Sequence, residues 1–299
     1  MKDCIVFTGG PKKESKDYDL SLKEYNTWKV GGKAEYFFEP HDLEDLKIFL
    51  NLTFDEKVTF LGNGSNVLIR DNGVEGYVVC LKKSLNNHHI NSENRFIFEA
   101  GLSCMKIAQI SAKQNYTGLE FLCGVPGTLG GALKMNAGCY GGNIWDNIYD
   151  VTLINKKGDL IKKEKHDFKI SYRNVDIDDN NFFVSASFNL KKNKMNNSLK
   201  IIKDFLKDRR SNQPTGLPSC GSVFKNPENL HAAKILDSLG LKGFRVGGAY
   251  VSEKHANFII AEKSAKSKDI EKLISFIQNK VYKDKKIALE TEVKFIGIE

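Results

Sequence analysis

The stretch GLEFLCGVPGTLGGALKMNAGCYGGNIW, residues 118–145, is the most unusual part of the chain. Eight of the 25 glycines fall within it, and between Phe121 and Trp145 the only formal charge is Lys134. Glycine loses more backbone freedom on folding than any other residue, so many glycines together indicate that backbone passes close to something. An uncharged loop rich in backbone N–H groups can bind an anion or lie flat against a planar ligand. We interpret the stretch as a cofactor cradle; a glycine-rich cluster of turns is the alternative.

The composition is ordinary for a soluble globular protein that is long enough for two domains. The chain has 299 residues, of which 41% are hydrophobic and 27% are charged. It has no run of about 18 apolar residues, and its N-terminus lacks the layout of a signal peptide. We therefore expect a cytoplasmic protein with no membrane insertion.

The cysteines show no C-x-x-C spacing, so they suggest neither a zinc site nor a disulfide framework. We expect no metal, and reduced, mostly buried thiols. The six are Cys4, Cys80, Cys104, Cys123, Cys139 and Cys220.

The net charge of +8 is compatible with a nucleic-acid or small anionic partner. Lysines occur in short pairs all along the chain, with no single basic helix, so we expect a solvated surface and no nucleic-acid partner. Arginine is scarce, with six residues against 39 lysines among the 45 basic ones. The planar guanidinium suits carboxylate or phosphate recognition, which singles out Arg173 and the pair Arg209-Arg210.

A second glycine loop, Gly62-Asn63-Gly64-Ser65-Asn66, lies between two short apolar runs at 58–61 and 67–69. A dinucleotide fingerprint or a P-loop needs a helix to begin directly after the glycines. Here a β-type run follows, so both interpretations fail. The loop can still hold a phosphate through backbone N–H groups, with Ser65 and Asn66 adding side-chain donors.

The remaining patterns predict an α+β fold, because strands outnumber helices in the first two thirds and the last third mixes them. Asp42, Ser103, Asn229 and Ser267 are expected at helix starts. Strands are expected at 77–81, 95–99, 151–155, 160–163, 182–190 and 289–298, and helices at 42–50, 103–116, 199–210, 229–240 and 267–281.

Seven segments, in this order over nearly the whole chain, resemble the bacterial UDP-N-acetylenolpyruvoylglucosamine reductases, which are flavoenzymes of cell-wall precursor synthesis. The segments are Asn26-Thr27 with Gly31-Gly32, LGNGSN at 61–66, GVPGTLGGALKMNAG at 124–138, Tyr172-Arg173-Asn174, PSCGSVFKNP at 218–227, GG with VSEKHANF at 247–258, and LETEV at 289–293.

The resemblance implies two domains. Residues 1–198 resemble the FAD-binding module shared with the vanillyl-alcohol oxidase group, in two α+β halves at about 1–82 and 83–198. Residues 199–299 resemble a smaller α+β substrate-binding domain. The CGS form of the serine loop matches the shorter class of the family, so no lid tyrosine is assigned.

The family reaction reduces an enolpyruvyl ether to a lactyl ether, with NADPH reducing FAD and reduced FAD giving hydride to the vinyl carbon. Ser222 matches the family's proton donor; a serine that caps its own turn is the alternative. Arg173 matches the arginine that stabilises charge on the substrate carboxylate; a surface arginine is the alternative. Glu292 matches the active-site glutamate, although period-two alternation places Glu290 and Glu292 on the same polar face.

The resemblance also assigns binding residues for a non-covalent FAD, for NADPH as co-substrate and for the UDP-enolpyruvyl sugar. Arg173, Lys225 and Asn226 correspond to substrate contacts. Asn212 stands where many members have a lysine, so a phosphate contact there is lost or comes from Lys225 or Arg210. The FAD contacts are Gly62, Asn63, Gly64, Ser65, Asn66, Gly124, Pro126, Gly127, Thr128, Gly130, Gly131, Asn136 and Gly138.

Two other functions remain open at this point. One is an FAD oxidase of the same superfamily that uses oxygen; many such oxidases attach flavin to histidine, and the cradle contains none. The other is a basic nucleic-acid-binding protein, which would be colourless and bind with a steep salt dependence. We expect a monomer.

Overall fold

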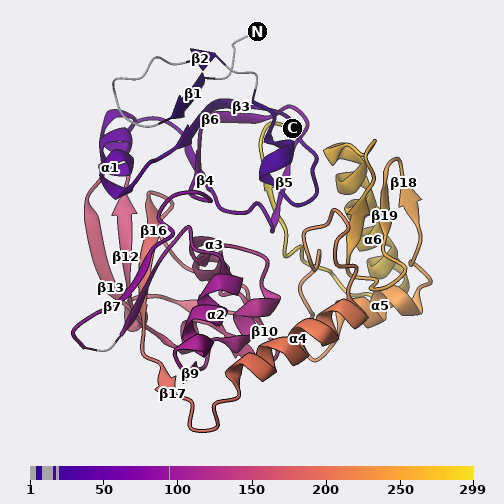
Figure 1. Cartoon of the computed structure of the whole chain (residues 1–299). Helices are drawn as coiled ribbons and strands as arrows, with labels where there is room; N and C mark the ends of the chain where they lie inside the picture. The colour runs from indigo at the N-terminus through magenta and orange to yellow at the C-terminus, as the bar shows by residue number, and fades with distance from the viewer. Residues whose placement is uncertain (1–4, 9–15, 18–19, 94) are drawn as a thin grey trace.

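A computed structural model describes residues 5–8, 16–17, 20–93 and 95–299, and Figure 1 shows three sheet-based units along the chain. Helices pack against each of the three sheets, so the predicted α+β class is confirmed.

The first unit is a sheet of order β2-β1-β3-β6-β4, in which β3, β6 and β4 pair in parallel. Helix α1 connects β3 to β4, and the Asp42 side chain caps it by accepting from the Asp45 N–H at 2.9 Å, as predicted. The elements are β1 Ile5–Thr8, β2 Lys16–Asp17, η1 Leu22–Tyr25, β3 Ala34–Glu39, α1 Leu43–Leu52, β4 Val58–Leu61, β5 Val67–Ile69 and β6 Val74–Cys80.

The second unit is an antiparallel sheet of order β13-β12-β16-β8-β7. Its strands are β7 His88–Ile90, β8 Phe96–Glu99, β12 Ile148–Asn155, β13 Leu160–Glu164 and β16 Asn181–Phe188. Short elements fill the connections: α2 Cys104–Lys113, β9 Tyr116–Thr117, η2 Glu120–Gly124, α3 Leu129–Lys134, β10 Gly138–Cys139, β11 Gly142–Asn143, η3 Ile144–Asp146, η4 Lys165–Asp167, β14 Ile170–Ser171, β15 Asn174–Val175 and β17 Lys191–Lys192.

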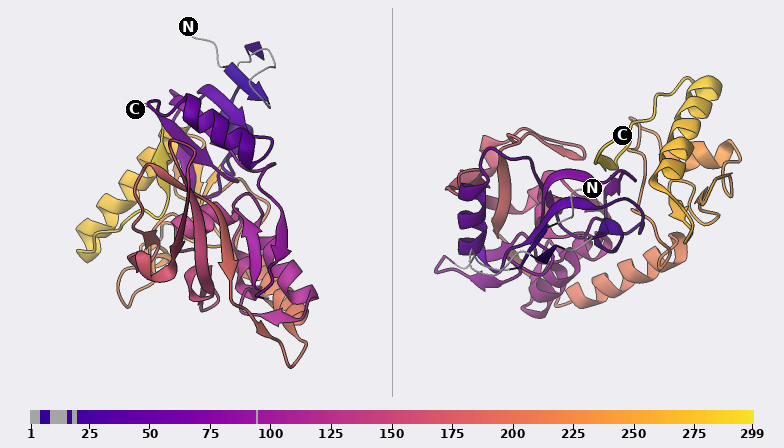
Figure 2. Two further views of the ribbon diagram at one scale, coloured as in Figure 1. Left: turned by 90° about the vertical axis from the view of Figure 1, so that its left-hand side faces the viewer. Right: turned by 90° about the horizontal axis from the view of Figure 1, so that it is seen from above.

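The third unit is a small antiparallel sheet of order β18-β19-β20 with two helices. Its elements are α5 Ala232–Ser238, β18 Arg245–Val246, β19 Ala249–Val251, β20 Ile259–Ala261, α6 Ser267–Lys285 and β21 Lys294–Ile296. The long helix α4, Ser198–Asn212, leads into it from the second unit, as Figures 1 and 2 both show. The inner face of α4 packs on the second unit's core through Ile202, Phe205 and Leu206. A domain boundary at residue 198 stays a prediction.

Helix α1 joins the first two units. Leu46, Phe49 and Leu50 on its inner face are buried in one cluster with residues of both sheets. Phe60 of β4 and Phe182 of β16 stack in the same cluster, with ring centroids 4.0 Å apart. The two sheets are therefore held together by an apolar layer, which fixes the loops at their ends relative to each other.

The third unit is joined to the first by shared core and by hydrogen bonds. Trp28 and Leu68 are buried in the third unit's core, and the Trp28 indole N–H donates to the Ile259 carbonyl at 2.8 Å. The Asp71 carboxylate accepts from the N–H groups of Ser267 and Lys268, both at 3.0 Å, and so caps α6. Strand β21 pairs in parallel with β5, and Figure 1 shows the two side by side.

Two sequence predictions about the third unit are wrong. The strand expected over 289–298 is reduced to Lys294–Ile296, because residues 290–292 hydrogen-bond to the Ser222 loop instead of to a sheet. Asn229 does not cap the next helix, which begins at Ala232 with His231 before it. The helix that follows Ser103 is also shorter than expected, since it ends at Lys113 near the left-handed Asn115.

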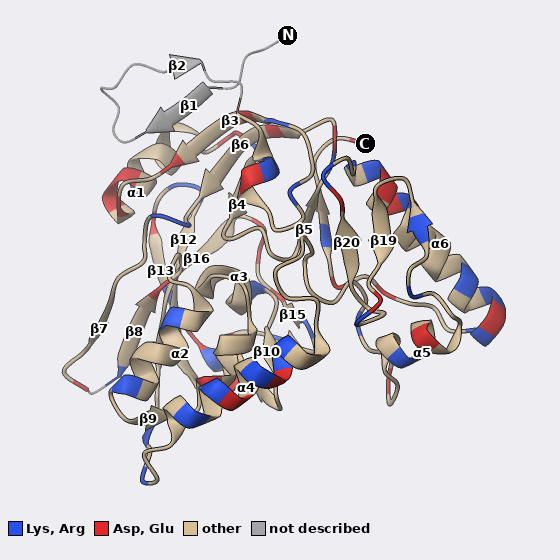
Figure 3. Ribbon diagram, turned by 45° about the vertical axis from the view of Figure 1, so that its right-hand side comes forward, with Lys and Arg blue, Asp and Glu red and all other residues tan. Residues whose placement is uncertain are grey.

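Lysines and arginines lie on many elements with acidic residues among them, as Figure 3 shows for α4 and α6. Within the described ranges, no helix combines the length and apolar character needed to cross a bilayer. Cys80, Cys104, Cys123 and Cys220 are buried free thiols and Cys139 is half-buried, which agrees with the expected burial; Cys4 lies outside the described residues.

Candidate active site

The two glycine loops predicted to hold a cofactor lie against each other. A Cβ atom on Gly62 would fall 2.2 Å from Thr128 Oγ1, and one on Gly127 would fall 3.2 Å from Ser65 Oγ. The Asn63 side-chain amide donates to the Pro126 carbonyl at 3.2 Å. The loop at 62–66 from the first unit and the stretch at 126–128 from the second therefore form one continuous backbone surface.

Gly64 adopts a conformation that requires glycine. Its φ is +60°, and a Cβ atom there would fall 2.1 Å from the Tyr25 carbonyl oxygen. The Gly64 carbonyl in turn accepts from the Thr27 N–H at 3.1 Å. The loop at 62–66 therefore packs closely on residues 25–27, which explains why Asn26-Thr27 is one of the seven segments named above.

The long cradle is packed tightly at most of its glycines and open at two, Gly141 in a turn with a φ of +81° and Gly131 in a helix. Cβ atoms on Gly124, Gly130 and Gly138 would fall 2.7, 3.2 and 2.4 Å from the nearest protein atoms, whereas Gly131 in α3 has no atom within 4 Å. Gly131 therefore leaves uncovered helix surface, which a planar ligand could occupy.

Asn136 supplies a polar group beside this surface. Its side chain is 8% exposed and its amide donates to the Ser171 carbonyl at 3.0 Å, but Oδ1 has no partner among the described residues. A buried acceptor without a partner is uncommon and indicates a missing donor. The flavin ring carries such an N–H, so these residues fit the group that the sequence implies.

Arg173 and Glu292 meet across the second and third units. Arg173 Nε lies 2.9 Å from Glu292 Oε1, and the two side chains are 16% and 18% exposed. Arg173 also donates from Nη2 to the Gly138 carbonyl at 2.7 Å and from Nη1 to the Asn136 carbonyl at 3.4 Å. The cradle therefore holds the guanidinium, and Arg173 is not a loose surface arginine.

Glu292 is held through its main chain as well. Its N–H donates to the Val223 carbonyl at 2.8 Å, and its carbonyl accepts from the Asn66 side-chain amide at 3.0 Å. Burial raises the pKa of the Glu292 carboxyl above its usual value, while the charges of Arg173 and then Lys225 oppose that rise. Asn66, expected to donate to a phosphate, thus uses its amide to position the glutamate segment.

Glu290 and Glu292 do not share a face, contrary to the alternation argument. Glu290 is 75% exposed and pairs with Lys225 Nζ at 3.0 Å, while Glu292 turns toward Arg173. The alternation fails because this segment is not a regular strand.

Ser222 lies beside this cluster because Val223, the next residue, is hydrogen-bonded to Glu292. Ser222 is half-buried, and its hydroxyl makes no hydrogen bond within the part of the chain that the structure describes. Nothing fixes this hydroxyl on its own turn, so it remains available to a ligand. The preceding Gly221 has a φ of +79° and no atom within 4 Å of its Cβ position.

A cavity of about 300 Å³ opens next to the serine loop and the cradle. Among the polar side chains that line it, Arg209 was singled out from the sequence only together with Arg210, and Gln213 was not singled out; Arg209 Nε donates to Gln213 Oε1 at 3.1 Å. Helical spacing could have chosen Arg209 over Arg210, because it continues the inner face of Ile202, Phe205 and Leu206. The residues that line the cavity are Thr27, Pro126, Arg209, Gln213, Pro214, Thr215, Gly216, Leu217, Ser219, Gly221 and Phe258.

Lys225 and Asn226, the other expected substrate contacts, are engaged within the protein. Lys225 pairs with Glu290, and Asn226 Oδ1 accepts from the Ala232 N–H at 3.0 Å at the start of α5. Asn212 is likewise engaged, since its amide donates to Asp208 Oδ1 at 2.7 Å. Within the described ranges Asn226 and Asn212 make no hydrogen bond to Arg173 or Glu292, whereas the charge of Lys225 acts on Glu292.

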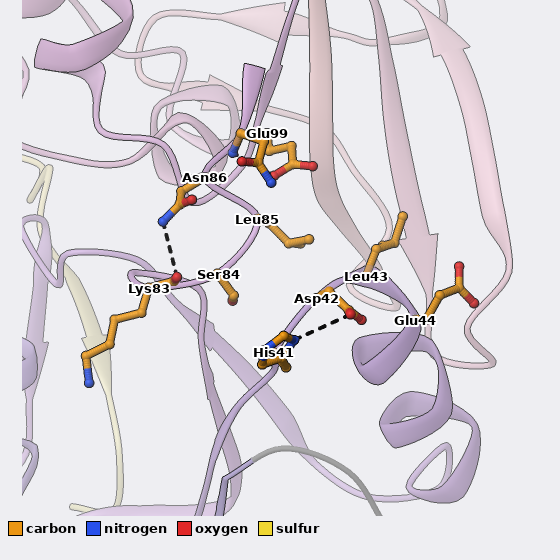
Figure 4. A pocket seen from close by; sticks show the side chains of 10 residues that line it. His41, Asp42, Leu43, Glu44, Lys83, Ser84, Leu85, Asn86 and Glu99 are labelled. Carbon is orange, nitrogen blue, oxygen red and sulfur yellow. Dashed lines mark hydrogen bonds and ion pairs between the residues drawn. The ribbon is translucent and has the colours of Figure 1, made fainter. Parts of the chain in front are cut away.

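A second hollow, of about 260 Å³, lies between the start of α1 and the loop at 83–87 (Figure 4). None of the residues predicted from the sequence to bind or react lines it. Among its ionisable side chains, His41 lies 3.5 Å from Asp42, and Lys83 lies 3.1 Å from Glu39. Pro126 of the cradle and Gly221 of the serine loop line the 300 Å³ cavity, although Ser222, Arg173 and Glu292 do not. We therefore place the candidate active site where that cavity adjoins the serine loop.

Comparison with known proteins covers nearly the whole chain. Residues 34–163 match the model of an FAD-binding domain, and residues 213–296 match that of the UDP-N-acetylenolpyruvoylglucosamine reductase C-terminal domain. A UDP-N-acetylenolpyruvoylglucosamine reductase from Legionella pneumophila (strain Corby) is 45% identical over 282 residues, covering 94% of this chain and 92% of the relative. One from Nitrosomonas eutropha is 41% identical, covering 92% and 87%.

Among solved structures, a UDP-N-acetylenolpyruvylglucosamine reductase from Thermus caldophilus superposes with a TM-score of 0.81. It is 29% identical in sequence, and the match covers 93% of this chain and 98% of that one.

Proposed function

Because this chain belongs to the UDP-N-acetylenolpyruvoylglucosamine reductase family, we propose that it reduces UDP-N-acetylenolpyruvoylglucosamine to UDP-N-acetylmuramate, with NADPH as the source of reducing equivalents. The observation that carries the assignment to this site is the hydrogen bond from the Glu292 N–H to the Val223 carbonyl. This hydrogen bond brings the serine loop next to Glu292. The ion pair of Glu292 with Arg173 then places both at the edge of the glycine cradle.

The first glycine loop, at 62–66, and the cradle residues Gly124 to Gly131 with Asn136 and Gly138 would hold FAD without a covalent bond. Bound FAD supplies the hydride that is added to the terminal vinyl carbon of the substrate. The uncovered surface at Gly131 and the unpaired Asn136 Oδ1 support this placement.

Arg173 would stabilise the charge that hydride addition creates beside the substrate carboxylate. Its guanidinium is fixed by two cradle carbonyls and Glu292, so it needs little reorganisation when charge develops. Glu292 holds that guanidinium in place and limits the net charge of the buried site.

Ser222 would donate the proton that completes the reduction at the carbon next to the carboxylate. A serine hydroxyl is a weak acid, but the carbanion that it protonates is strongly basic. The absence of a hydrogen bond to this hydroxyl within the described chain leaves it free to point at the substrate.

Arg209 is the best-placed cation for the diphosphate of the nucleotide sugar, since it lines the cavity and is oriented by Gln213. It would supply the contact that Asn212 cannot, in place of Lys225 or Arg210. We propose further that the enzyme works as a monomer in the cytoplasm, where its nucleotide substrates occur, without a nucleic-acid partner.

An anaerobic experiment tests the proposal in two steps. NADPH first reduces the flavin of the purified protein, and UDP-N-acetylenolpyruvoylglucosamine is then added while the return of flavin absorbance is followed. Ser222→Ala should leave the first step nearly intact and slow the second by orders of magnitude. Ser238→Ala, which removes a hydroxyl bonded within α5, is the matched control. Equal slowing of both steps in Ser222→Ala would refute the proton-donor role.

A further inference from the structure

The backbone that follows Ser222 is held on one side by the C-terminal segment. The Glu292 N–H donates to the Val223 carbonyl at 2.8 Å, and the Lys225 N–H donates to the Glu290 carbonyl at 2.9 Å. These bonds set the distance between the serine loop and the glutamate. They leave the N–H of Val223 and both main-chain groups of Phe224 to find partners elsewhere.

Asn257 supplies all three of those partners. Its Oδ1 accepts from the Phe224 N–H at 3.0 Å, its amide donates to the Phe224 carbonyl at 2.8 Å, and its own carbonyl accepts from the Val223 N–H at 2.9 Å. The Asn257 side-chain amide thus pairs with both main-chain groups of Phe224, as the backbone of a neighbouring β-strand would. Phe224 is 1% exposed and Asn257 is 3% exposed, so water cannot replace these bonds without opening the loop.

Asparagine suits this position because of its chemistry and its length. An amide carries a donor and an acceptor on one planar group, whereas the carboxylate of aspartate only accepts and alanine offers neither. Loss of the amide would leave two main-chain groups of Phe224 buried without partners, two residues from the reacting hydroxyl.

We propose that Asn257 is a positioning residue for the reduction step: by holding the main chain of Val223 and Phe224, it places the backbone that carries Ser222 relative to Arg173 and Glu292. The inference rests on the proposed function, because it acts through Ser222. Misplacing a reacting group by about 1 Å can reduce a rate by about 100-fold, so a loosened loop should slow proton delivery without changing flavin reduction.

The test compares Asn257→Ala and Asn257→Asp with the unchanged protein in the two-step anaerobic assay. In both variants the reduction by NADPH should stay within about twofold, and the reoxidation by UDP-N-acetylenolpyruvoylglucosamine should slow by about 10- to 100-fold. In a Ser222→Ala background, Asn257→Ala should slow reoxidation by no more than about twofold further, because the group that it positions is already absent.

Asn193→Ala is the matched control. Asn193 is also a buried asparagine, 7% exposed, and its amide donates to Ser198 Oγ at 2.6 Å, in the turn before α4 and away from the serine loop. This variant should lower the melting temperature while leaving both steps of the assay unchanged. A general loss of packing would affect the two asparagine variants alike.

Several outcomes would overturn the inference: equal slowing of both steps in Asn257→Ala, an unchanged reoxidation rate, or the same fold-loss with and without the Ser222 hydroxyl. If Asn257→Ala does not fold, Asn257→Asp decides, because it keeps the size of the side chain and the acceptor for Phe224. If Ser222→Ala alone reoxidises at the normal rate, the proposed function fails at the proton donor and the inference fails with it.

Discussion

Arg173 and Glu292 form an ion pair, 2.9 Å from Nε to Oε1, that joins the second unit to the third. Each member is also fixed by the backbone of its own side, Arg173 by the Asn136 and Gly138 carbonyls and Glu292 by the Val223 carbonyl. Both side chains are mostly buried, so removing one partner leaves the other uncompensated.

The first prediction separates the two glutamates of the LETEV segment. Glu292→Gln should slow reoxidation of the reduced flavin strongly, because it removes the charge that orients Arg173. Glu290→Gln breaks only an exposed pair with Lys225 and should change the rate by no more than about twofold. The measurement is single-turnover reoxidation by the enolpyruvyl substrate, and a larger effect at Glu290 would contradict the assignment.

The second prediction concerns pH. Arg173→Met removes the largest influence that lowers the pKa of Glu292, so burial raises that pKa further. Between the ordinary value of 4.5 and the raised value, the folded protein binds a proton that the unfolded chain does not. The free energy of unfolding of Arg173→Met should therefore be fully retained below that window and decrease as pH rises through it.

Urea unfolding at several pH values between about 4 and about 8 measures this dependence. The double variant Arg173→Met/Glu292→Gln is the control, since it lacks the titrating group and should not show the added slope. Identical slopes in the two variants would exclude Glu292 as the source.

The third prediction uses Gly131, whose Cβ position faces open space. Gly131 lies inside α3, so Gly131→Ala should stabilise the flavin-free protein by about 0.5–1 kcal/mol. The added methyl group would meet a flavin packed on that surface, and FAD affinity should fall about tenfold or more. Gly62→Ala, which collides with Thr128, should lower both stability and affinity. Unchanged FAD affinity in Gly131→Ala would place the flavin elsewhere.

The fourth prediction concerns the paired arginines. Arg209→Ala should raise the KM for the nucleotide sugar roughly 10- to 100-fold, as expected for loss of a charged hydrogen bond of about 1.5–3 kcal/mol. Arg210→Ala is the matched control, because Arg210 is exposed and does not line the cavity. Steady-state kinetics of the two variants give the two KM values. Equal KM values would show that Arg209 does not bind the nucleotide sugar.

The sequence predicted best those features that depend on local chemistry. Asp42 and Ser103 are caps, the hairpin at residues 151–163 forms, and the glycine segment at 62–66 is a loop. The cradle, in contrast, contains the short helix α3, which the sequence did not predict. The glycines also predicted that the backbone passes close to other parts of the protein, and Gly62 does lie against Thr128.

What the sequence did not predict depends on contacts between distant segments. Residues 290–292 alternate like a strand, but their main chain bonds to the serine loop, so Glu290 and Glu292 point different ways. Nor did the sequence predict that the Asn66 amide donates to the Glu292 carbonyl, or that Asn226 Oδ1 accepts from the Ala232 N–H at the start of α5. The sequence singled out the pair Arg209-Arg210, but choosing Arg209 required the inner face of α4 to be recognised as part of a cavity wall.

The cap that Asp71 places on α6 has a consequence for synthesis on the ribosome. Trp28 and Leu68 belong to the third unit's core, and β5 pairs with β21, so the first unit emerges with apolar surface that residues near 259–296 must later cover. Domains commonly fold in the order in which they are translated. The first unit must therefore be kept from aggregating until residues 259–296 have been synthesised.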